Sequence, residues 1–82
     1  MRFIKITFKL GLAEKPKEEV TEMDIASIRD SIITLLTSKT SEQILTPQGK
    51  QTLRDQVRTR MNELPLGMNV VEVYIVDFVV QL

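Results

Sequence analysis

The sequence contains no cysteine and no histidine. The lack of cysteine excludes disulfide frameworks, thiolate metal sites and thiol nucleophiles. The lack of histidine removes the most versatile general acid–base group and the commonest metal ligand. The 3 glycines stand alone, and none belongs to a phosphate-binding glycine motif. These absences predict a chain with no catalytic residues, no cofactor and no metal site.

Net charge and long apolar runs are absent as well. The 11 Lys and Arg residues balance 11 Asp and Glu residues, so the chain has no positive field of the kind that attracts nucleic acid or an anionic membrane. No apolar run approaches the length of a membrane span, and the start of the chain lacks the pattern of a signal peptide. A chain of 82 residues can bury one modest core, so we expect a single domain over residues 1–82.

The first half of the chain predicts a strand and a long helix. Residues 2–11 alternate apolar and polar side chains, which is typical of a half-buried strand. An amphipathic helix follows and ends near Ser38, beginning either at Pro16 or at a capping box formed by Thr21 and Asp24. Its apolar stripe is expected to pack on the sheet and comprises Ile25, Ile28, Ile32, Leu35 and Leu36.

The second half predicts a short helical turn over residues 42–45, a third helix and a last strand. Thr46 and Pro47 are well suited to the N-cap and the first position of that helix, which stops before Pro65. Residues 69–82 are apolar on both faces, which indicates a strand covered on both sides or one with a bulge that changes its phase. The expected class is α+β: strand, long helix, short helical turn, helix and strand, with a small sheet covered by helices.

Two places carry side chains that could do chemistry. Asp77 lies between apolar residues of the last strand, but an ion pair or a bulge explains its position better than acid–base catalysis does. Ser38 lies next to Lys39, as in a Ser–Lys nucleophile pair. Capping of the helix end explains that hydroxyl more simply.

Two other patterns predict an interaction surface. Basic residues recur every four positions along the third helix and could bind an acidic partner or phosphates; they are Lys50, Arg54 and Arg58. A solvated helix face explains the pattern more simply, with pairings of Gln51 with Asp55 and of Asp55 with Arg58. If helices cover only one face of the last strand, the other face exposes an apolar strip of the kind that marks a partner surface or the place of an extra strand. The side chains expected there are Tyr74, Val76, Phe78 and Val80.

Three segments taken together resemble one known family. They are the helix end at residues 28–40 (IRDSIITLLTSKT), the helix start at residues 45–54 (LTPQGKQTLR) and the strand at residues 71–81 (VEVYIVDFVVQ). Their order and spacing are similar to those of the C-terminal, periplasmic domain of the flagellar basal-body-associated FliL family. Residues 2–12 resemble the preceding strand of that domain.

The resemblance implies a single-pass protein on the periplasmic side of the bacterial inner membrane, at the flagellar basal body. It implies a stomatin/prohibitin (SPFH)-like fold that forms a homo-oligomeric ring around flagellar stator proteins of the MotA/MotB type, which supports torque and swimming or swarming motility. It further implies that the membrane anchor and a first strand lie outside these residues. That strand is expected to cover the last strand.

A KH-like nucleic-acid-binding module is the alternative, because it shares the order of strand, two helices and strand. A KH domain clamps the nucleic-acid backbone with a Gly-x-x-Gly loop between its helices, and the segment between these helices has no such pair.

Overall fold

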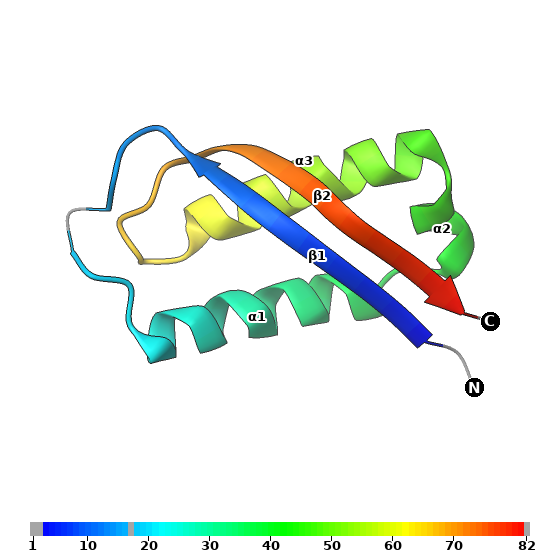
Figure 1. Ribbon diagram of the computed structural model, residues 1–82, viewed down its shortest axis with the longest axis horizontal. Coiled ribbons are helices and arrows are strands. Elements are labelled where there is room, and N and C mark those ends of the chain that lie inside the picture. Colours follow the sequence, from blue (N-terminus) through cyan, green and yellow to red (C-terminus); the bar gives the residue numbers. More distant parts are fainter. Residues whose placement is uncertain (1–2, 17, 82) are drawn as a thin grey trace.

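The computed structural model describes residues 3–16 and 18–81 and has two layers, a sheet and a group of helices (Figure 1). The elements in chain order are β1 (Phe3–Leu12), α1 (Glu22–Thr37), α2 (Ser41–Leu45), α3 (Pro47–Glu63) and β2 (Val70–Gln81). The two strands form an antiparallel sheet. The predicted α+β class and the order of its elements are confirmed. Arg2 and Leu82, which the sequence assigned to the strands, lie outside the described residues.

The last strand contains two bulges. The pairing of β1 with β2 shifts between Thr7 and Phe8 and again between Gly11 and Leu12, which leaves Val76 and Val71 of β2 without a partner. Each bulge moves the following side chains to the other face of the strand. The inward side chains of β2 are therefore unevenly spaced, and the strand looks apolar on both faces in the sequence. The predicted bulge is confirmed.

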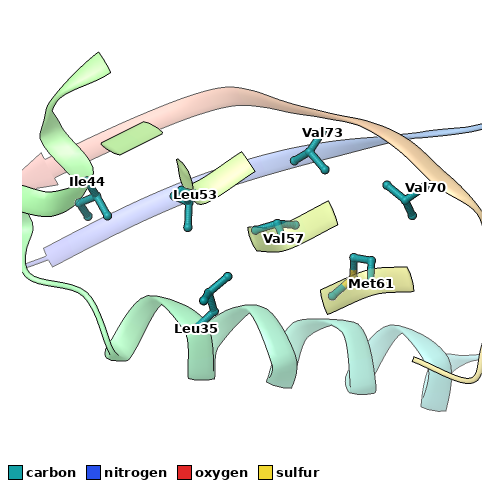
Figure 2. Packing of buried hydrophobic residues seen from close by; sticks show 7 residues of the cluster. All are labelled: Leu35, Ile44, Leu53, Val57, Met61, Val70 and Val73. Carbon is teal, nitrogen blue, oxygen red and sulfur yellow. The ribbon is translucent and has the colours of Figure 1, made fainter. Parts of the chain in front are cut away.

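Most of the core lies between α3 and β2. Among the described residues, seven side chains are buried (Figure 2): Leu35, Ile44, Leu53, Val57, Met61, Val70 and Val73. Helix α3 begins as predicted, with the backbone N–H of Gly49 donating to Oγ1 of Thr46 at 2.9 Å and Pro47 in the first position. Its far end is tied to β2 by Asn62, whose side chain donates to the carbonyl of Val70 at 2.9 Å and accepts from its N–H at 2.7 Å.

Helix α1 begins at the capping box rather than at Pro16. The N–H of Asp24 donates to Oγ1 of Thr21 at 3.1 Å, and the N–H of Thr21 donates to Oδ2 of Asp24 at 2.9 Å. These bonds satisfy two backbone donors that have no partner within the helix. The acidic residues just after Pro16 are therefore part of an irregular connector.

The apolar stripe of α1 packs on the core only in part, since Ile28, Ile32 and Leu36 are partly buried against it and the stripe faces β1 across an open groove. The backbone of α1 approaches that of α3 and of neither strand. Leu35 is the only side chain of α1 that is fully buried, while Ile25 and Ile33 are 44% and 58% exposed. Neighbouring strands lie about 4.8 Å apart and packed helices about 8–10 Å apart. A two-stranded sheet is therefore wide enough for α3 and leaves α1 uncovered.

The short helix α2 lies against the start of α3 through a very close approach. A Cβ atom on Gly49 would lie 1.6 Å from the carbonyl oxygen of Gln43. Glycine is therefore required where these two helices meet, and the buried side chain of Ile44 depends on that contact.

Candidate interaction surface

The basic residues of α3 lie on the flank of the helix beside the unpaired edge of β2. Successive residues are roughly 100° apart around a helix, so Arg54 and Arg58 project sideways from the buried face that holds Leu53 and Val57. The opposite flank, which includes Gln56, borders α1. In Figure 1, β1 occupies the side of β2 nearer α1, which leaves the other edge of β2 next to the basic flank.

Two contacts bring this basic stripe (Lys50, Arg54 and Arg58) onto β2. Nζ of Lys50 lies 4.8 Å from the ring centroid of Phe78, which is a cation–π contact. Arg54 and Arg58 line a hollow of about 370 Å³ together with residues 71–74 of β2, among them Tyr74. The three cations therefore follow the strand over most of its length.

The stripe keeps much of its hydrogen-bonding capacity. Nη1 of Arg54 donates to Oε1 of Gln51 at 3.1 Å, and Nε2 of Gln51 donates to Oδ1 of Asp55 at 3.1 Å, which confirms the predicted pairing of Gln51 with Asp55. In the described part of the chain, the expected pairing of Asp55 with Arg58 is not formed. A guanidinium carries five N–H donors, so both arginines can still bind carboxylates.

The four strand residues predicted for the same surface do not lie together. Tyr74 points outward opposite Lys9 and is 53% exposed, and Val76 is the bulge residue and is 47% exposed. Phe78 and Val80 instead belong to the inward face, where they pair with apolar residues of β1 and are partly buried. The bulge at Val76 causes this division. Of the four, Tyr74 lines the hollow with the two arginines.

The sequence did not predict an apolar groove between β1 and α1. Its volume is about 730 Å³, and Lys5 and Arg29 are the charged residues that line it. The apolar lining comes from both elements and includes Ile4, Ile6, Phe8, Ile25, Ile28 and Ile32. The sequence does show the apolar faces of β1 and α1, but both faces were assigned to the core. A sheet of two strands cannot bring both faces together.

The residues considered for chemistry have structural roles. Oγ of Ser38 donates to the carbonyl of Leu35 at 2.6 Å, which confirms its capping role at the end of α1. Asp77 is exposed opposite Thr7, next to the bulge. No group of three or more potential metal ligands occurs in residues 3–16 and 18–81. Among those residues, no helix is long and apolar enough to cross a membrane.

Fold and surface together define a small two-layer α+β domain with a cationic sheet edge and an open apolar groove. A family model described as "Flagellar basal body-associated protein FliL" matches residues 1–81, and the chain belongs to this family. The resemblance seen in the sequence is confirmed.

Two curated relatives are called flagellar protein FliL. That of Aquifex aeolicus (strain VF5) is 33% identical over 79 residues, which cover 96% of this chain and 49% of the relative. That of Bacillus subtilis (strain 168) is 30% identical over 79 residues, which cover 95% of this chain and 56% of the relative. The chain therefore spans about half the length of these relatives. Family membership favours a flagellar basal-body-associated role over the KH-like alternative.

Proposed function

We propose that this chain is a non-catalytic module of the flagellar motor that forms oligomers around the stator ion channel and supports torque and motility. The stator proteins would be of the MotA/MotB type, and the module would lie on the periplasmic side of the inner membrane with an SPFH-like fold. Membership of the flagellar family supports the setting. The observation that carries the interaction role is the basic stripe beside an unpaired strand edge.

We also propose that the first strand implied by the family resemblance lies in the groove beside β1, rather than over the last strand. The inward face of β2 already packs on α3, whereas the groove between β1 and α1 is open. Two strands alone are marginally stable, and a third completes a sheet. The test is amide hydrogen exchange: β1 should exchange more slowly in the full-length protein than in residues 1–82 alone. Equal rates would contradict this placement.

The functional proposal is tested by reversing the charge of the stripe in the full-length protein in cells. The variant Lys50→Glu/Arg54→Glu/Arg58→Glu should shrink swimming zones in soft agar and reduce co-isolation with the stator. The matched control makes the same charge change at exposed positions elsewhere, Lys9→Glu/Lys15→Glu/Arg60→Glu. Light scattering and native mass spectrometry report the oligomer. Unchanged motility in the first variant, or a protein that stays monomeric at high concentration, would contradict the proposal.

A further inference from the structure

We propose that the hollow between α3 and the unpaired edge of β2 binds an extended acidic segment of a different polypeptide, with carboxylates at every second residue. The proposal rests on the interaction role of the basic stripe and names the chemistry of its partner. It does not depend on which flagellar protein supplies the segment.

The spacing of the cations fits an extended chain. Residues four apart on a helix are separated by about 6 Å along its axis, and alternate residues of a strand by about 6.6–6.8 Å. Carboxylates at positions i, i+2 and i+4 of an extended segment can therefore each meet one of Lys50, Arg54 and Arg58. Ion pairs of a guanidinium with a carboxylate can be bidentate, which adds directionality.

The edge of β2 favours an extended partner over a helical one. Among the described residues, β2 pairs with β1 alone, so its other edge has backbone N–H and C=O groups without a strand partner. An extended segment can bond to these groups, whereas a helix satisfies its own backbone. The bulges at Val71 and Val76 leave only residues 72–75 as regular strand between them. Backbone pairing is therefore short, and charge supplies most of the affinity.

The orientation of the segment follows from the charges around the hollow, which is lined by two carboxylates, Glu72 and Asp55, as well as by the two arginines. The side chain of Glu72 belongs to the outward face of the sheet and would repel a carboxylate there. Asp55 accepts a hydrogen bond from Gln51, so the carboxylates of the segment must face the guanidinium groups of Arg54 and Arg58. Lys50 is held by Phe78, and Arg54 is held by Gln51. This prior ordering lowers the entropy cost of binding.

A second copy of this chain does not fit the hollow. Its β1 edge carries Lys5 and Lys9, its β2 edge carries another basic stripe, and like charges would face each other. The acidic connector, described over residues 13–16 and 18–20, contains Lys15 and also Pro16, which has no N–H to donate. The described residues of a second copy therefore do not supply the segment, and the proposal takes a different polypeptide as the occupant.

The probe is an acetylated and amidated seven-residue peptide that alternates threonine and glutamate, with three glutamates. The control peptide has the same composition with its glutamates consecutive. We expect the alternating peptide to bind the full-length protein about fivefold more tightly, and to lose about tenfold in affinity between low and high salt because the contacts are ionic. Chemical-shift changes should centre on residues 72–75 and the stripe.

Two substitutions keep the test informative. Arg54→Gln/Arg58→Gln removes both guanidinium groups while keeping side-chain length, and it should abolish the preference for the alternating peptide. Arg60→Gln on the same helix should leave it unchanged. Equal binding of the two peptides overturns the proposal, as does unaltered binding by the Arg54→Gln/Arg58→Gln variant. Self-association that this variant abolishes would also overturn it, since the occupant would then be a second copy.

The outcomes separate this proposal from the functional one. Selective peptide binding together with normal motility of the charge-reversed variant would refute the motor role and keep the acidic-segment site. Impaired motility without selective peptide binding would refute the site and keep the motor role.

Discussion

On the side of the sheet where β2 meets α3, the inward side chains Val70 and Val73 are buried, those nearer the end of β2 are partly buried, and the flank of α3 beside them is cationic. On the other side, β1 contributes no fully buried side chain and α1 contributes only Leu35. The apolar side chains of β1 and α1 face each other across an open groove instead. The comparison indicates that one half of the molecule holds the fold together, while the other half exposes surface that a further element can bury.

The cause of the difference is the width of the two layers. Two packed helices span about twice the width of two paired strands. Helix α3 lies under β2 and takes most of the buried contacts, so α1 can reach only α3. The four predictions that follow test whether the half formed by α3 and β2 stabilises the fold more than the half formed by α1 and β1. They are given in decreasing order of expected effect.

The largest expected effect comes from shortening a core side chain of α3. Leu53 is 0% exposed, so Leu53→Ala removes buried methyl groups and leaves a cavity, at a cost of about 3 kcal/mol in the free energy of unfolding. Ile33→Ala on α1, where the side chain is 58% exposed, should cost no more than about 0.5 kcal/mol. Urea denaturation followed by circular dichroism measures both. Similar losses in the free energy of unfolding in the two variants would refute this difference between the two halves of the molecule.

The same measurement tests the proposed first strand. Ile25 lines the groove and is 44% exposed. Ile25→Ala should cost more in a chain that carries the proposed strand than in residues 1–82, while the cost of Leu53→Ala stays the same.

The second prediction concerns the junction of α2 and α3. Gly49→Ala would place a Cβ atom 1.6 Å from the carbonyl oxygen of Gln43, and the helices must separate to relieve that overlap. We expect a loss of about 2–3 kcal/mol, typical of overpacking, with increased exposure of Ile44. Gln48→Ala, at the preceding exposed position, is the control and should be nearly neutral. A stable Gly49→Ala protein would show that α2 is not needed to complete the core.

The third prediction concerns the tie between α3 and β2. Asn62→Ala removes both partners of the backbone N–H and C=O of Val70, a fully buried residue. Unsatisfied buried backbone groups are costly, so we expect a loss of about 1–2 kcal/mol. Asn62→Asp keeps the acceptor and removes the donor, and it should therefore fall between the wild type and Asn62→Ala. If both variants match the wild type, water replaces the side chain.

Local sequence signals were sufficient for most of the fold. The caps at Thr21 and Thr46 are local chemistry, since each side chain bonds to a backbone N–H three residues later. The bulge in the last strand was one of two interpretations of its apolar residues on both faces, the other being a strand covered on both sides. The requirement for glycine at position 49 was not predicted, because it depends on a contact with α2 that the local sequence does not show.

The surface was less predictable than the fold. The basic stripe follows from helical periodicity alone, and the structure places it at a strand edge. The strand residues were assigned to one face because an even period of two was assumed, and the bulge at Val76 moves Phe78 and Val80 inward. The groove was missed because its two apolar faces are separated in sequence. Whether these two faces pack tightly against each other depends on the number of strands in the sheet.

The smallest expected effect compares the N-caps of the two long helices. Thr46→Ala and Thr21→Ala each remove one hydrogen bond to a backbone N–H, which costs about 1 kcal/mol at a typical cap. At α3 the loss should appear as lower global stability, because that helix carries the core. At α1 the first turn has little buried surface, so the loss should appear as faster amide exchange confined to residues 22–26, with a smaller change in the urea midpoint. Thr→Ser at either position retains the acceptor and should restore most of the loss. Equal global losses would show that α1 unfolds together with the core and that the two halves are a single cooperative unit.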